Sequence, residues 1–222
     1  MLVEIWSDIA CPWCYIGKRR FEQALAEFEH RDDVQLIWRS FELDPAAPDE
    51  LKGERAARLA AKYGMSVEQA REAEQRMVDT AAAEGLDFRF DIARSGRTFD
   101  AHRLVHLAHE HGRGDEAKER LLRAYFTEGE LMSDRDSLVR LGAEVGLDEQ
   151  EIRAVLAGER YASEVRGDER TAAELGITAV PTFVIDRAIG VSGAHPPAAL
   201  LEFLKQGWTS HRGQPAGSVE AA

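Results

Sequence analysis

Residues 7–20, SDIACPWCYIGKRR, hold both cysteines of the 222-residue chain, Cys11 and Cys14. The strand-forming run LVEIW precedes them at 2–6, and apolar residues at helical spacing follow as far as Phe28. Pro12 suits the first turn of a helix, where its missing N–H removes no hydrogen bond. The sequence therefore predicts that the cysteine pair lies where a strand gives way to a helix.

Such a pair can be a structural disulfide, half of a metal site or a redox reagent. A chain of this length can bury a proper core without a disulfide. The opening residues MLVEIWSDIA lack the basic region, long apolar core and cleavage site of a secretory signal, so we expect a cytoplasmic protein. Because cytoplasmic thiols are kept reduced, a close pair there is more often catalytic or metal-binding than structural.

The helix N-terminus suggests different roles for the two sulfurs. Unpaired N–H groups and the helix dipole favour a thiolate at Cys11, whereas Cys14 lies one turn further in and is expected to be less exposed. Cys11 would then form a mixed disulfide with a partner, and Cys14 would resolve it. We interpret Asp8 as a local structural residue; the alternative is a negative charge that raises the pKa of Cys11.

The rest of the chain gives an α/β pattern. A second strand at 34–43 completes a β-α-β unit whose crossover implies parallel strands. About 110 residues of helical pattern follow, with helix starts expected at Ser66, Thr98 and Asp148. A helix at 164–177, a hairpin of TFVID and AIGVSGA, and a helix at 196–207 closed by Gly207 complete the order β-α-β, helical block, α-β-β-α. Residues 208–222 are expected to be a disordered tail.

Charge and hydropathy exclude two classes of partner. The net charge is -12 and the sequence pI is near 5.1, which repels nucleic acid at long range. No window reaches the ~18 consecutive apolar residues of a membrane span. We therefore expect neither a nucleic-acid nor a membrane partner.

Several motifs in order resemble one family. The segments SDIACPWCYIGKRRFEQAL, FELDP, TFDAHRLVHLA, GITAVPTFVI and GVSGAHPP, between residues 3 and 206, are similar to the DsbA-type thioredoxin-fold oxidoreductases, specifically the cytoplasmic FrnE-like branch. The resemblance implies a thioredoxin fold interrupted by an all-helical insertion domain. It divides the chain into a thioredoxin-like domain at 1–44 and 160–207, an insertion at 45–159 and a flexible tail at 208–222.

The resemblance also implies roles for particular residues. Cys11 would be the nucleophile and Cys14 the resolving thiol. Pro181 would be a cis-proline beside the cysteines, and the backbone of Val180 would bind an extended substrate. From the residues alone, a trans proline at a strand entry is the default.

Besides Pro12, two residues are candidates for contact with substrate, Trp13 and His102. Trp13 either packs at the start of the helix or contacts substrate. His102 is expected to line the active-site groove, with a hydrogen-bonded histidine between domains as its alternative. Together with His106 and His109 it falls at helical spacing, so a zinc site shared with the cysteines is a second alternative, although no metal is our prediction.

The chain departs from the family pattern at a few positions. The family often has Asn at the position of Arg97 and Gln at that of His195, which leaves their substrate contacts open. The further cysteine motif of some FrnE-like proteins is absent, which excludes a relay between two pairs.

The predicted function is that of a thiol–disulfide oxidoreductase or isomerase acting on proteins or small thiol compounds. It needs no cofactor beyond its own cysteines, with glutathione as a candidate co-substrate, and is expected to be a monomer or homodimer. One alternative is a glutathione-dependent isomerase or transferase for aromatic or polyketide-like substrates, a related branch that has Ser at the position of Cys11. The other is a non-enzymatic, redox-sensitive binding or chaperone module.

Overall fold

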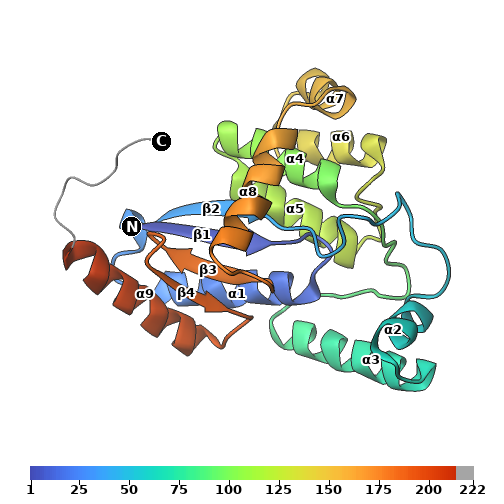
Figure 1. Ribbon diagram of the computed structural model, residues 1–222, viewed down its shortest axis with the longest axis horizontal. Helices are drawn as coiled ribbons and strands as arrows, with labels where there is room; N and C mark the ends of the chain where they lie inside the picture. Colours follow the sequence, from blue (N-terminus) through green and yellow to red (C-terminus); the bar gives the residue numbers. More distant parts are fainter. Residues whose placement is uncertain (214–222) are drawn as a thin grey trace.

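A four-stranded mixed sheet forms the centre of the computed structural model, which describes residues 1–213 (Figure 1). The order across the sheet is β2-β1-β3-β4. β1 is parallel to β2 and antiparallel to β3, and β3 and β4 form the predicted hairpin. The strands are β1 Leu2–Ser7, β2 Gln35–Ser40, β3 Thr182–Ile185 and β4 Ile189–Ser192.

Helices cover both faces of this sheet. α1 (Pro12–Glu27) and α9 (Pro197–Gly213) pack together on one face, and α8 (Ala162–Glu174) crosses the other, where it also contacts α4 (Figure 1). The remaining helices lie between β2 and α8 in the sequence, as the helical block predicted. They are α2 Arg55–Tyr63, α3 Val67–Ala83, α4 Phe99–Glu110, α5 Gly114–Phe126, α6 Arg135–Glu144 and α7 Glu149–Ala157, with a short 3-10 turn at Arg31–Asp33 before β2.

Successive side chains of β1 point to opposite faces of the sheet, and so they contact different layers of helices. Ile5 belongs to the main core, and Phe183 opposite it on β3 stacks on Phe21 of α1 with ring centroids 5.2 Å apart. Trp6 points to the other face, where its indole N–H donates to the Asp168 carbonyl of α8 at 2.9 Å. The alternation of side chains along β1 thus determines the packing of helices on both faces of the sheet.

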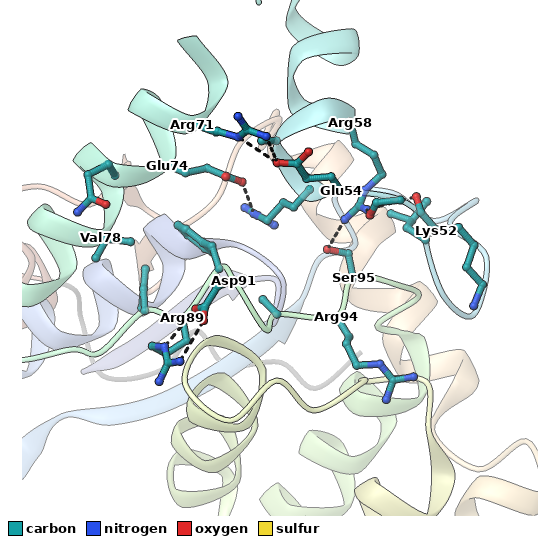
Figure 2. Close-up of a pocket in the computed structure, with 18 of the residues that line it drawn as sticks. Lys52, Glu54, Arg58, Arg71, Glu74, Val78, Arg89, Asp91, Arg94 and Ser95 are labelled. Atoms are coloured by element: carbon teal, nitrogen blue, oxygen red, sulfur yellow. Dashed lines mark hydrogen bonds and ion pairs between the residues drawn. The ribbon is translucent and has the colours of Figure 1, made fainter. Parts of the chain in front are cut away.

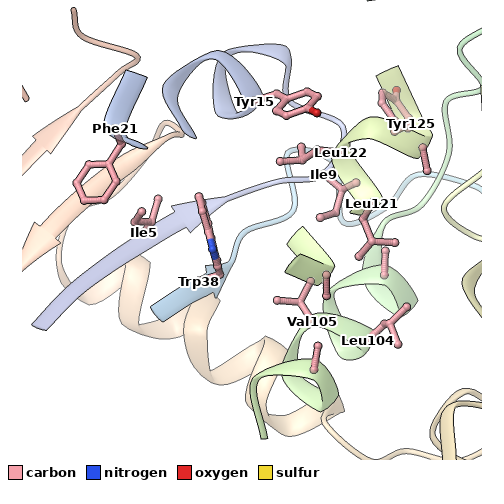
Figure 3. Packing of buried hydrophobic residues seen from close by; sticks show 14 of the residues in the cluster. Ile5, Ile9, Tyr15, Phe21, Trp38, Leu104, Val105, Leu121, Leu122 and Tyr125 are labelled. Carbon is pink, nitrogen blue, oxygen red and sulfur yellow. The ribbon is translucent and has the colours of Figure 1, made fainter. Parts of the chain in front are cut away.

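The apolar core continues from the sheet into the helical block (Figure 3). Ile5 and Trp38 on the strands belong to the same buried cluster as Leu104 of α4 and Leu121 of α5. Tyr15 of α1 connects the two parts, because its hydroxyl donates to Glu119 Oε1 at 2.7 Å. Sequence boundaries at 44 and 160 therefore do not divide the core.

Most predicted helix starts are confirmed. Ser66 and Gln69 form a reciprocal capping box, and the Asp148 carboxylate accepts the N–H of Glu151. Thr98 stands at the N-cap of α4, but its side chain makes no capping hydrogen bond. The second strand is shorter than predicted, because the chain leaves the sheet after Ser40.

The predicted end of the last helix at Gly207 is wrong. α9 continues to Gly213, so residues 208–213 are helical, and residues 214–222 of the predicted tail lie outside the described part. Gly207 allows close packing instead of ending the helix: a Cβ there would lie 2.4 Å from Ile185 Cδ1. Trp208 then stacks on His30 at 4.3 Å, which stabilises the extra turn.

Candidate active site

The two cysteines occupy the first turn of α1, as predicted. Cys11 is the N-cap residue, Pro12 follows it at the first helical position, and both cysteines are free thiols. Cys11 is 4% exposed and lines a cavity, whereas Cys14 is fully buried and does not. Of the two cysteines, only Cys11 therefore borders this cavity.

A loop 170 residues downstream completes the site. The Cys11 thiol donates to the carbonyl oxygen of Val180 at 3.5 Å, and the Val180–Pro181 peptide bond is cis. Pro181 packs on α1 where Gly17 leaves room, since a Cβ at Gly17 would lie 2.7 Å from Pro181 Cγ. The structure thus brings Cys11 into contact with Val180 and places Pro181 against the same helix.

The electrostatics of the pair differ from the prediction. Hydrogen bonding to the Cys14 thiol, followed by burial and the charge of Cys14, raises the pKa of Cys11 well above its ordinary value. The backbone N–H of Cys14 lowers the pKa of Cys11, as a helix N-terminus should, but this effect is smaller, and the charge of Asp8 raises it further. The helix N-terminus alone does not make Cys11 a thiolate.

Asp8 is a buried carboxylate one turn before Cys11. Its Oδ1 accepts the N–H of Ala10 at 3.3 Å and its Oδ2 accepts the N–H of Leu43 at 2.8 Å. Burial raises the pKa of Asp8, but hydrogen bonds from His102 and from Leu43 lower it, with a net pKa below the ordinary value. Asp8 therefore fixes the loop and also places a negative charge near the thiols, so both interpretations of it hold.

His102 does not line the groove, which corrects its predicted place. Its ring is 1% exposed, and its Nε2 lies 3.4 Å from Asp8 Oδ1. Burial lowers the pKa of His102 despite the hydrogen bond to Asp8. It is the buried histidine between the two parts of the chain that formed its alternative.

Lys118 of α5 is a residue at the site that the sequence analysis missed. It is 1% exposed, and its Nζ donates to the carbonyl oxygen of Ser7 at 3.1 Å. The signal was present: Lys118 stands three and four residues before the buried Leu121 and Leu122, on the core-facing side of its helix. It was overlooked because lysine on an amphipathic helix is normally solvated.

The cavity at Cys11 has a volume of about 760 Å³. One wall is formed by the active-site segment, including Pro12, and by Val180 with its two preceding residues. The other comes from α2, α3 and the turn between them, with apolar contributions from Leu59, Tyr63, Met65 and Met77 and basic ones from Arg55, Arg58 and Lys62. The insertion thus supplies the wall facing the cysteines.

Trp13 is 43% exposed and lines this cavity, so of its two interpretations the structure supports an accessible aromatic surface. The two positions that depart from the family pattern lie elsewhere. Arg97 pairs with Asp49 at 2.6 Å, and His195 Nε2 lies 2.9 Å from the carbonyl oxygen of Ser192. Neither lines the cavity.

A second cavity, of about 770 Å³, lies beside α2 and α3 (Figure 2). Several of its charged side chains are paired with one another, as in Arg71 with Glu54 at 2.8 Å and Arg89 with Asp91 at 3.0 Å. Neither cysteine lines it. Of these two cavities, the one at Cys11 is therefore the candidate active site.

Residues 1–213 contain no group of three or more His, Cys, Asp or Glu side chains that is placed to hold a metal ion. His106 instead contacts Asp168 at 3.1 Å, and His109 is exposed. In the same range, no helix combines the length and apolar character needed to span a membrane.

Known proteins resemble the chain over nearly its whole length. It is 50% identical to the probable DsbA oxidoreductase SCO1869 from Streptomyces coelicolor, whose crystal structure aligns with a TM-score of 0.92 over 100% of this chain and 94% of that one. It is 30% identical over 185 residues to the uncharacterized protein YwbO of Bacillus subtilis, covering 82% of this chain and 86% of its relative.

A more distant structure shares the fold. The cytosolic disulfide reductase DsbM from Pseudomonas aeruginosa is 19% identical and aligns with a TM-score of 0.65 over 96% of this chain and all of DsbM; it has also been solved with GSH. The model of the DSBA-like thioredoxin domain matches residues 2–205. With the thioredoxin fold, the cysteine pair at the start of α1 and this match in place, the chain belongs to the DSBA-like thioredoxin family.

Proposed function

We propose that this protein is a thiol–disulfide oxidoreductase of the FrnE-like branch that works in the cytoplasm on small-molecule or peptide disulfides. The observation that carries the proposal is the position of Cys11: the residue lines a cavity, and its sulfur lies 3.5 Å from the carbonyl oxygen of Val180. Cys14 is buried directly behind it. This is the arrangement that separates an attacking sulfur from a resolving one.

The reaction proceeds in two exchanges. The Cys11 thiolate attacks one sulfur of a substrate disulfide, forming a mixed disulfide and releasing the other half of the substrate as a thiolate. Cys14, after losing its proton, attacks the Cys11 sulfur, closes the Cys11–Cys14 disulfide and releases the second half. Two electrons pass from the dithiol to the substrate, and the two protons end on the released thiols. Two equivalents of a thiol such as glutathione return the enzyme to the dithiol form.

The backbone of Val180 supports the binding of an extended substrate. Among residues 1–213 its N–H donates to no acceptor, and the residue borders the cavity. A substrate strand can therefore pair with it without breaking an existing hydrogen bond. The apolar wall from α2 and α3, with the exposed ring of Trp13, suits the hydrophobic part of such a substrate.

The test is reduction of glutathione disulfide or of a disulfide-containing peptide by the dithiol form of the protein. The progress of the reaction is measured as the loss of protein thiols. We expect one enzyme disulfide for each substrate disulfide reduced. Cys11→Ser should abolish the reaction while the protein stays folded. Full activity of this variant would contradict the proposal.

A further inference from the structure

A lysine from the helical block is buried against Ser7, the last residue of the strand that leads to the cysteines. Lys118 Nζ has the Ser7 carbonyl oxygen at 3.1 Å and lies 5.4 Å from the ring centroid of Trp38, a cation–π distance. Withdrawing an ammonium group from water costs several kcal/mol unless partners compensate for it. A carbonyl and an aromatic face compensate for only part of that cost.

The ammonium group has donors left over. It carries three N–H bonds, and within residues 1–213 the Ser7 carbonyl is its only hydrogen-bond acceptor. Burial lowers the pKa of Lys118 to about 8, while attraction to Cys14, Asp8 and Cys11, strongest for Cys14, acts against burial. Lys118 therefore remains mostly protonated near neutral pH, within electrostatic reach of Cys14.

Besides the cysteines, three groups interact electrostatically with this ammonium: Asp8, Lys18 and His102. Asp8 precedes α1 and is already held by two backbone N–H groups and His102. Lys18, one turn beyond Cys14 on α1, repels the ammonium of Lys118, and His102 of α4 lies within its electrostatic reach. The two cysteines are the groups whose charge changes when the disulfide is reduced.

We infer that Lys118 is the counter-ion of the thiolate formed by the Cys11–Cys14 pair, so that a residue of the helical block controls the reactivity of the cysteines. This inference rests on the proposed redox function. Lys118 acts through the cysteines and does not touch substrate.

A counter-ion at this position changes the equilibrium between the disulfide and dithiol forms. Reduction of the Cys11–Cys14 disulfide by two glutathione molecules forms one glutathione disulfide and the enzyme dithiol. Ionisation of that dithiol then leaves one thiol and one thiolate, and releases one proton to water. The new negative charge appears beside the positive Lys118. Loss of that positive charge destabilises the thiolate, which favours the disulfide form and makes the protein less oxidising.

The chain offers a matched control in Lys18. This lysine is also buried, at 2% exposed, and lies 6.0 Å from the same Trp38 ring. Its charge is neutralised by carboxylates: Asp115 at 3.4 Å, Glu119 at 3.1 Å and Glu22. Lys18→Met therefore removes a buried ammonium near Trp38 that already has its own counter-ions.

The experiment compares Lys118→Met, Lys118→Arg and Lys18→Met with the wild type, each shown to be folded by circular dichroism. Thiolate absorbance of the dithiol form is titrated against pH, and the redox equilibrium with glutathione is measured. For Lys118→Met we expect the thiolate midpoint to rise by about one pH unit and the equilibrium to shift about tenfold toward the disulfide, or about 30 mV. Lys118→Arg and Lys18→Met should stay within about threefold of the wild type.

Two results would overturn the inference: an unchanged midpoint and equilibrium in folded Lys118→Met, or equal shifts in Lys118→Met and Lys18→Met. Should Lys118→Met not fold, ¹⁵N-lysine NMR of the wild type decides, because linkage requires the pKa of Lys118 to be higher in the dithiol form than in the disulfide form. Equal values would reject the counter-ion role. Failure of the wild type itself to exchange disulfides is a different result, which rejects the proposed function.

Discussion

The thiol of Cys11 donates to the carbonyl oxygen of Val180 at 3.5 Å, although 169 residues separate them in the chain. This contact joins the start of α1 to the loop before β3, and both residues line the same cavity. The loop that contains Val180 and the first turn of α1 therefore belong to the same site, and substitutions in either can affect Cys11.

Cys14→Ser should stop the reaction after its first exchange. Cys11 can still attack a disulfide, but no second sulfur is available to resolve the product. We expect a stable mixed disulfide between Cys11 and glutathione when the variant is treated with glutathione disulfide, detected by intact-protein mass spectrometry. Cys11→Ser is the control and should form no adduct; an adduct on Cys14 there would reverse the assigned roles.

Gly17→Ala tests the close contact between α1 and Pro181. The added Cβ would lie 2.7 Å from Pro181 Cγ, so either the helix or the loop must move. We expect a loss of about 1 to 3 kcal/mol in the free energy of unfolding, measured in urea, and slower alkylation or exchange at Cys11.

Gly167→Ala is the matched control for that substitution. It also adds a methyl group to a helical glycine, but the nearest atom, of Arg170, is 3.8 Å away. This variant should be as stable as the wild type or up to about 1 kcal/mol more stable. Equal effects of the two substitutions would contradict the packing argument.

His102→Gln should weaken the dependence of stability on pH. The pKa of His102 is lowered by burial, so below its ordinary value of 6.5 the unfolded chain binds a proton that the folded protein resists. Stability is therefore full above about pH 6.5 and falls as the pH drops toward the folded pKa. Glutamine keeps a hydrogen-bond donor for Asp8 but does not titrate.

The measurement is the free energy of unfolding at pH 7.5 and 5.5 for both proteins. We expect the wild type to lose about 1 kcal/mol more than His102→Gln over this interval. Because the other titrating groups are common to both proteins, the difference isolates His102. A parallel loss in the two proteins would show that His102 does not titrate in this way.

Trp13→Ala tests the accessible aromatic at the cavity. Its ring is 43% exposed, so its removal should change the free energy of unfolding by less than about 0.5 kcal/mol. We expect the second-order rate constant for a peptide disulfide with aromatic neighbours to fall about tenfold, since contact area at the rim is lost. Leu175→Ala, at a similarly exposed apolar position outside the cavity, should leave the rate unchanged.

Much of the fold could be predicted from local patterns. The strand at 2–6, the proline after Cys11, the Ser66 capping box and the hairpin at 182–192 each depend on neighbours within a few residues, and each is found. The end of α9 was mispredicted because Gly207 was interpreted as a helix stop. Its contact with Ile185 of β3 is long-range and gives no local signal.

By itself, the sequence determined the order of the elements, the family and the place of the cysteines, because helix caps, strand alternation and motifs are local or near-local properties. Only the tertiary structure decided the electrostatics of the site. The burial of His102 and Lys118, the raised pKa of Cys11 and the wall supplied by α2 and α3 follow from packing between the helical block and the sheet. The pKa of a side chain depends on its burial and on the charges and hydrogen bonds around it, and these are set only when the chain folds.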